Sequence, residues 1–99
     1  MNRRETKFLD KVGNCYLMRV LEVFIESRSL PYAQTDICII AGISHKAAKD
    51  TINELLELGY IKEEENKSGR NFQLYMLNSD NYYVKHYIAI FDKALFERR

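Results

Sequence analysis

Two helix-forming stretches separated by a glycine turn constrain this fold more than any other sequence feature. The segment 36–41 is short and apolar, and Gly42 follows it, where glycine accepts the left-handed backbone that ends a helix. Ser44 is then a good N-cap for a longer helix over 45–58. Helices joined by so tight a turn cross steeply, so the outer face of the second one projects from the domain. Its inward side is expected to be Ala48, Ile52, Leu55 and Leu56.

The segments before this pair indicate further helical structure. Residues 4–12 are expected to form either a short helix or an arm. From residue 15 to 27 the apolar residues fall at helical spacing, which predicts a helix. Pro31 stops that helix, and a very short strand is expected beside it. The next helix then opens at Gln34 or Thr35.

The second half of the chain changes from helical to strand-like patterning. Residues 60–65 and 72–77 are expected to pair as strands around the polar turn 66–71. A last helix is expected over 82–98. This order predicts a mainly helical α+β fold, a winged helix-turn-helix with a C-terminal dimerisation helix. We interpret residues 1–99 as a single winged-helix domain with its helix-turn-helix at 35–58, its wing at 60–77 and its C-terminal helix at 82–98.

Composition places the chain among ordinary globular proteins. Its 99 residues include 46% hydrophobic and 29% charged residues, with a net charge of +1. No apolar run approaches the ~20 residues of a membrane span, and the charged N-terminus has no secretory apolar core. We therefore expect a cytoplasmic protein with no membrane partner. Cys15 and Cys38 are expected to be buried small apolar residues.

The outward side of the helix over 45–58 carries side chains suited to duplex DNA. Asparagine pairs with adenine, and lysine reaches guanine or phosphate. Asp50 either accepts a hydrogen bond from cytosine or pairs with Lys46 one turn away. The near-zero net charge is the main objection, because phosphate binding needs lysine and arginine. The predicted DNA contacts of the helix-turn-helix are Thr35, Ser44, His45, Lys46, Lys49, Asp50 and Asn53.

The predicted wing tip adds a second group of DNA contacts. A flexible basic tip beside a recognition helix suits phosphate or minor-groove contact. The acidic run 63–65 argues against the wing root lying on DNA. The predicted contacts at the tip are Lys67, Ser68, Arg70 and Asn71.

The last helix carries two apolar stripes, although a surface helix of a monomer needs only one. One stripe is Val84, Ile88, Phe91 and Leu95, and the other is Tyr83, Tyr87, Ile90 and Ala94. The second stripe indicates a partner subunit, although both stripes packing on the chain's own first helices is the alternative. The predicted dimer contacts are Tyr83, Tyr87, Ile90, Phe91 and Ala94.

Enzyme chemistry is not indicated. His45 and His86 have no neighbours in sequence that suggest a metal pair or a catalytic dyad. We find no glycine-rich phosphate loop, paired catalytic carboxylates or nucleophile elbow. We expect no cofactor and no metal, and the sequence does not reveal a small-molecule effector.

Over residues 8–95 the chain resembles the small archaeal winged helix-turn-helix regulators of the broad MarR/ArsR group. The resemblance is carried by FLDKVGN at 8–14, RVLEVFIE at 19–26, LPYAQTDICIIAGIS at 30–44, INELLELGYIK at 52–62, LYMLNSDN at 74–81 and VKHYIAIFDKAL at 84–95. It implies a regulator of transcription that binds specific DNA sequences as a dimer.

Two alternatives share this fold. A plasmid or viral partition or replication adaptor would bind DNA repeats cooperatively and recruit a motor. A winged-helix module that binds protein instead of DNA is favoured by the near-zero net charge and by the acidic run 63–65.

Overall fold

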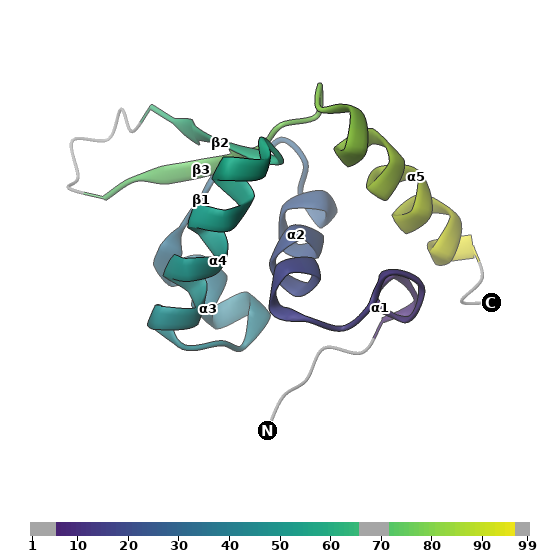
Figure 1. The fold of residues 1–99 in the computed structure, drawn as a ribbon, viewed down its shortest axis with the longest axis horizontal. Helices are drawn as coiled ribbons and strands as arrows, with labels where there is room; N and C mark the ends of the chain where they lie inside the picture. The colour runs from purple at the N-terminus through teal and green to yellow at the C-terminus, as the bar shows by residue number, and fades with distance from the viewer. Residues whose placement is uncertain (1–5, 66–71, 97–99) are drawn as a thin grey trace.

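The computed structural model describes residues 6–65 and 72–96, and the elements follow the predicted order (Figure 1). In chain order they are α1 (Lys7–Val12), α2 (Tyr16–Glu26), β1 (Tyr32–Ala33), α3 (Gln34–Ala41), α4 (His45–Leu58), β2 (Ile61–Glu64), β3 (Leu74–Leu77) and α5 (Tyr82–Phe96). The mainly helical winged-helix fold class is thereby confirmed. Within the described residues, no helix has both the length and the apolar character needed to span a membrane.

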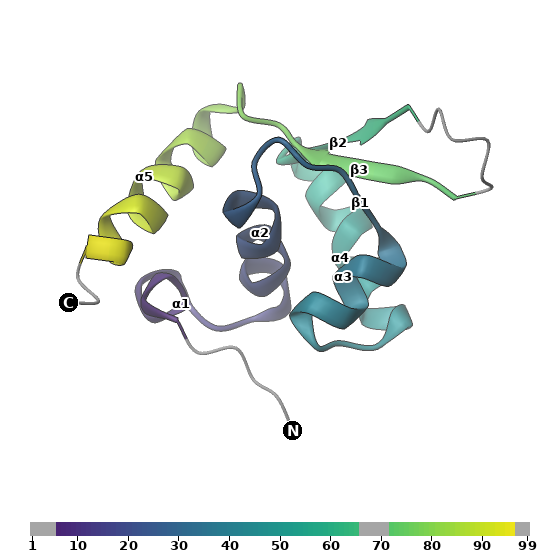
Figure 2. The ribbon, with the colours of Figure 1, turned by 180° about the vertical axis from the view of Figure 1, so that it is seen from behind.

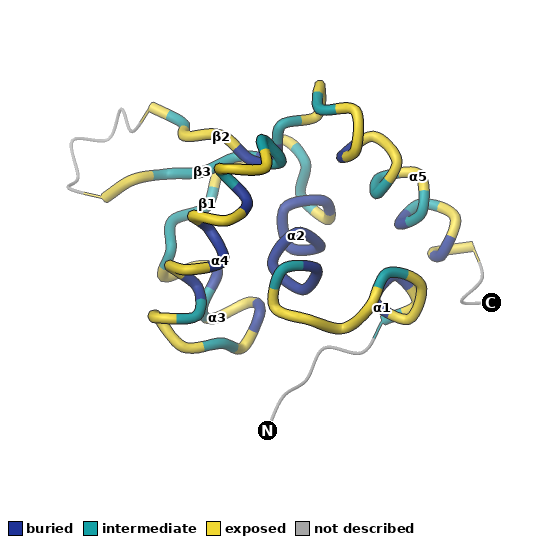
Figure 3. Tube along the Cα trace, viewed as in Figure 1, coloured by how far each residue is buried: buried dark blue, intermediate teal, exposed yellow. Residues whose placement is uncertain are grey.

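Helix α2 is the centre of the molecule. Every residue from Met18 to Ile25 is buried, on all sides of the helix. Helices α3 and α4 pack on one side of α2, and α1 and α5 lie on the other (Figures 1 and 3). A helix that is buried all round needs neighbours all round, so α2 organises both halves of the fold.

Two charged residues inside this core hold neighbouring elements to α2. Arg19 donates from Nη2 to the carbonyl oxygen of Ala41 at 2.7 Å, at the end of α3. Glu22, only 1% exposed, accepts at 2.7 Å from the hydroxyl of Thr6, which also caps α1. Buried charges need such partners, because leaving them unpaired in an apolar interior is costly. The two bonds therefore fix α3 and the start of α1 against α2.

The sheet is small and antiparallel, with strand order β1-β3-β2. Tyr32 pairs with Tyr75 across β1 and β3, and Ile61 pairs with Leu77 across β2 and β3. The two hairpin strands are shorter than the predicted ranges 60–65 and 72–77. The last pair of the β2–β3 ladder is Glu64 with Leu74, and the side chain of Gln73 donates to the carbonyl oxygens of both residues.

Two asparagines join the end of α4 to the start of α5. Asn78 and Asn81 both donate from Nδ2 to the carbonyl oxygen of Gly59, at 2.9 and 3.1 Å. Asn81 Oδ1 accepts from the backbone N–H groups of Tyr83 and Val84, and so caps α5. Gly59 has a φ of 77°, and a Cβ there would lie 3.3 Å from Asn81. The direction of α5 is therefore set by this junction.

The N-terminal segment settles one alternative and corrects one expectation. Residues 7–12 form the helix α1, whose Phe8 ring packs edge-on against Phe91 of α5 at 5.8 Å. Cys15 is exposed, contrary to expectation, because it occupies the N-cap position where the chain turns into α2. Cys38 is only half-buried.

Candidate nucleic-acid interface

The predicted start of the outward helix is present in the structure. Ser44 Oγ accepts from the backbone N–H of Ala47 at 3.1 Å, so the N-cap prediction is confirmed. Gly42 ends α3 with a φ of 69°, a left-handed conformation that a β-branched residue would resist. The turn between α3 and α4 is therefore built from the two residues that the sequence identifies.

Helix α4 separates its two faces cleanly. Its buried residues are Ala48, Thr51, Ile52 and Leu55, and Leu56 packs against the core while remaining half-buried. The seven predicted DNA contacts of the helix-turn-helix are all exposed; they are Thr35, Ser44, His45, Lys46, Lys49, Asp50 and Asn53.

Helix α3 holds the first turn of α4 in place. Gln34 donates from Nε2 to the carbonyl oxygen of His45 at 3.2 Å. The Sγ atom of Cys38 lies 3.4 Å from Nδ1 of the His45 ring. Burial raises the pKa of the Cys38 thiol. The exposed side chains at the start of α4 thus stand on a fixed backbone.

Two charges on the outward face of α4 pair with each other. Lys46 Nζ lies 3.3 Å from Asp50 Oδ2, and both side chains are mainly exposed, at 88% and 65%. Such a pair on a helix surface contributes only about 0.3–0.5 kcal/mol to stability, because water screens it. Both groups are therefore free to exchange this contact for another partner.

A depression of about 500 Å³ lies between the start of α3 and strand β3. Thr35 is exposed at this depression, and Gln73 and Phe72 border it from the hairpin. Sequence reasoning predicted Thr35 but missed Gln34 and Gln73, because the pairing of β1 with β3 brings them together and no local pattern shows it. The residues that line the depression are Ala33, Gln34, Thr35, Asp36, Phe72, Gln73 and Tyr75.

The root of the wing is acidic. Glu63 and Glu65 are exposed, and Glu64 is half-buried. Burial, together with the neighbouring Glu63 carboxylate, raises the pKa of Tyr75 on the adjacent strand. The predicted tip contacts Lys67, Ser68, Arg70 and Asn71 lie outside the described residues.

The structure divides the predicted dimer contacts of α5 into two groups. Phe91 and Ala94 are 8% and 3% exposed, which corrects their assignment to a partner surface. The reason is that the chain's own α1 packs on this side of α5. Tyr83 is 58% exposed, whereas Tyr87 and Ile90 are partly buried against the core.

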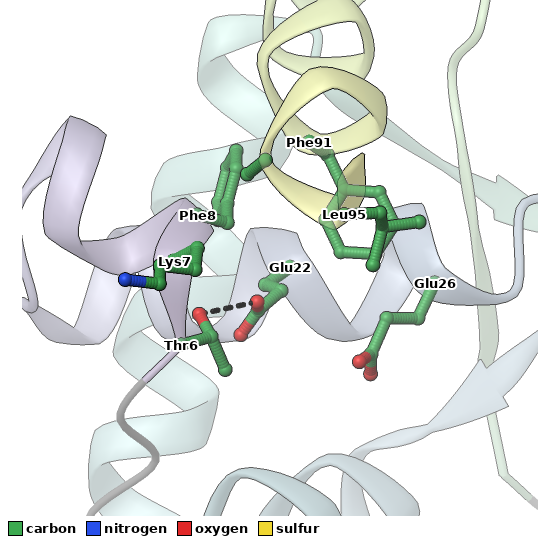
Figure 4. Close-up of a pocket in the computed structure, with 8 residues that line it drawn as sticks. Thr6, Lys7, Phe8, Glu22, Glu26, Phe91 and Leu95 are labelled. Carbon is green, nitrogen blue, oxygen red and sulfur yellow. Dashed lines mark hydrogen bonds between the residues drawn. The ribbon is translucent and has the colours of Figure 1, made fainter. Parts of the chain in front are cut away.

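A second concave feature lies between α1, α2 and α5 (Figure 4). The Thr6 hydroxyl points to the Glu22 carboxylate across its floor, and the rings of Phe8 and Phe91 stand above it. Its volume is about 30 Å³, far below the ~300–1,000 Å³ of typical ligand pockets. In this state it has room only for molecules about the size of water.

Comparison with known proteins connects the fold to a class. No protein-family model matches the sequence, and no curated protein is significantly similar to it. Solved structures do match. The MarR family regulator NMB1585 from Neisseria meningitidis superimposes with a TM-score of 0.67 at 19% identity, covering 89% of this chain and 58% of that one. The fold is therefore that of a MarR-like winged helix.

Two further matches were solved with DNA. A mutant of MepR from S. aureus, bound to an oligodeoxyribonucleotide, gives a TM-score of 0.66 at 15% identity, with 87% of this chain and 64% of that one covered. A mutant of ZitR from Lactococcus lactis, in complex with DNA, gives 0.61 at 17% identity, with 81% and 56% covered. The chain thus spans less than two thirds of the length of these proteins.

Proposed function

We propose that this protein binds specific sequences of double-stranded DNA as a homodimer and regulates transcription, with α4 as its recognition helix. The observation that carries the proposal is the outward polar face of α4, fixed by α3 and standing beside a winged sheet. Support also comes from the fold shared with the MarR family regulator NMB1585 and with the mutants of MepR and ZitR that were solved with DNA.

The dimensions and the charge of α4 favour its N-terminal half as the part that enters a major groove. Its 14 residues span about 21 Å, and a major groove is ~12 Å wide. The lysines 46 and 49 lie in the first half, together with the positive end of the helix dipole. Glu54 and Glu57 lie in the second half and would be repelled by phosphates. We assign His45 and Asn53 to the same reading surface.

The depression beside α3 suits the passage of a DNA strand next to that groove. The hydroxyl of Thr35 and the second amide N–H of Gln34 are neutral donors for phosphate oxygens at its border. Ser44 stands at the end of α4 that carries the positive dipole. For the wing tip we propose phosphate or minor-groove contacts by Lys67, Ser68, Arg70 and Asn71.

The outward side of α5 suits a second copy of the chain. Five of its exposed residues recur at intervals of four, three, four and three, the spacing of a helix-pairing seam. Large apolar groups stand at both ends of the seam: Tyr82 is 67% exposed and Phe96 is 73% exposed. Tyr83 flanks it. For a helix-turn-helix dimer we expect the two half-sites to lie about 34 Å, one DNA turn, apart. The seam is Tyr82, His86, Ala89, Lys93 and Phe96.

A protein-binding module is the second candidate function. Helix α4 carries two lysines against three carboxylates, a net charge of −1, and the wing root adds the acidic run 63–65. These charges oppose binding to a polyanion and suit a basic protein surface.

The test replaces Lys46 and Lys49 together by alanine and measures affinity for a genomic duplex pool at several salt concentrations. If each lysine contacts one phosphate, the slope of log affinity against log salt falls by roughly 2, at about 0.9 per contact. Affinity at low salt is expected to drop at least tenfold.

The matched control is Lys7→Ala with Lys85→Ala. It removes the same charge from exposed positions on α1 and α5, away from α4 (Figure 2). An equal loss in both double variants would contradict α4 as the reading element. No binding by the wild-type protein at low salt would favour the protein-binding function.

A further inference from the structure

A carboxylate occupies the middle of the outward face of α4. Lys46, Asp50, Asn53 and Glu57 follow one another at intervals of four, three and four residues, and all are exposed. At 100° per residue these positions fall within one narrow strip along the helix. Asp50 lies in the half of α4 that carries the lysines, and the Lys46 ammonium is 3.3 Å from its carboxylate.

This position is electrostatically unfavourable for general DNA affinity. A carboxylate facing a groove lined by phosphates is repelled, and ionised it accepts hydrogen bonds without donating any. Its ion pair with Lys46 also neutralises one of the two lysines of α4. Asp50 therefore lowers binding to DNA unless a base edge supplies a donor to its free oxygen.

We propose that Asp50 is the specificity-determining residue of α4 and that it selects a cytosine in the major groove. The inference rests on the proposed DNA-binding function. Cytosine presents the N4 amino group there, a donor for the carboxylate. Its paired guanine presents O6 and N7, which accept from the ammonium of Lys46. The Lys46 ammonium is a donor and the Asp50 carboxylate is an acceptor, and they lie 3.3 Å apart. Together they match the guanine acceptors and the cytosine donor of one G·C pair.

The other bases match this pair of groups less well. Adenine also carries an amino group, but its N7 lone pair lies beside it and repels the second carboxylate oxygen. Guanine and thymine offer only acceptors in the major groove, so a carboxylate facing either remains unpaired and desolvated. Asp50 therefore acts mainly by weakening binding to sequences without this cytosine, while contacts between the lysines and the DNA phosphates supply affinity.

The experiment selects bound sequences from a randomised duplex library with wild-type protein, Asp50→Ala and Asp50→Asn. For the wild type we expect one position to enrich cytosine about tenfold or more. Asp50→Ala loses that enrichment and binds random duplexes more tightly by roughly threefold to tenfold. Asp50→Asn moves the preference at the same position to adenine, which asparagine pairs with two hydrogen bonds.

Glu57→Gln is the matched control, because it removes one negative charge from the same strip in the acidic half of α4. It is expected to raise affinity without altering the selected sequence. Unchanged selection by both Asp50 variants, or equal relaxation by Glu57→Gln, would overturn the inference while leaving DNA binding intact. Failure of the wild type to enrich any duplex would overturn the proposed function, and this inference with it. Asp50 is exposed, so unchanged melting temperatures will show that its variants fold.

Discussion

Helices α4 and α5 are of almost equal length, and each buries one face, yet their outward faces differ in chemistry. They have 14 and 15 residues and lie at opposite ends of the molecule with α2 between them (Figure 1). The free face of α4 is polar and charged, whereas the free face of α5 carries Tyr82, Tyr83 and Phe96. The buried face of each helix therefore explains where that helix packs, whereas its exposed face indicates the kind of partner it suits.

The two helices also differ in how their ends are held. Helix α4 starts at a capping serine and touches α3 through His45. Helix α5 starts at Asn81, and Asp92 further along forms an ion pair with Arg28, which follows α2. The first turn of α4 is thus held against α3, whereas α5 is held at its start by Asn81 and further along by Arg28.

The largest expected effect is on the free energy of unfolding, and it tests the buried face of α4. Leu55 of α4 is fully buried, whereas Leu58, one turn later, is 44% exposed. Leu55→Ala should lower the free energy of unfolding by about 2–5 kcal/mol, because it leaves a cavity beside α2. Leu58→Ala should change it by less than about 1 kcal/mol. Urea unfolding measures both, and similar losses would contradict the separation of faces in α4.

The next prediction concerns the association of two copies of the chain through the exposed face of α5. Tyr82→Glu combined with Tyr83→Glu places one charge on the proposed seam and one beside it, where they repel those of a second copy. The negative charges suit the first turn of α5, so the helix itself should persist. Light scattering should give 11.7 kDa for this variant and about twice that for the wild type.

Ile39→Glu is the control for assembly, because Ile39 is 75% exposed on α3, far from α5 (Figure 1). It should leave the solution mass unchanged. A wild-type protein that stays at the monomer mass at high concentration would refute the seam.

The smallest expected effect is on the pH dependence of stability, and it concerns the tyrosines near the start of α5. Burial, with Tyr87 and Tyr83 nearby, raises the pKa of Tyr60 above its ordinary value of 10. The unfolded chain then ionises this phenol first, so its contribution to stability is complete below pH 10 and is lost as pH rises through the folded pKa. Tyr60→Phe should lose less stability than the wild type between neutral pH and pH 11. An equal loss of melting temperature in the two proteins between neutral pH and pH 11 would contradict the raised pKa of Tyr60.

The helix-turn-helix was readable from sequence because its signals are local. Ser44 and Gly42 act on backbone groups within a few residues, and the period of α4 identifies its buried side from neighbours three and four apart. The ends of the two wing strands could be predicted less accurately, because they depend on cross-strand pairing that no periodicity within one segment records.

What the sequence determined by itself was therefore the order of elements, the cap and turn of the helix-turn-helix, and the polar face of α4. The tertiary structure decided which side of α5 is free: Phe91 of one predicted stripe and Ala94 of the other are both buried on the side that α1 packs against. It also decided the partners of Arg19 and Glu22, and the depression between α3 and β3. The physical reason is that local propensities act over about one helical turn, whereas these features arise where segments distant in sequence pack together.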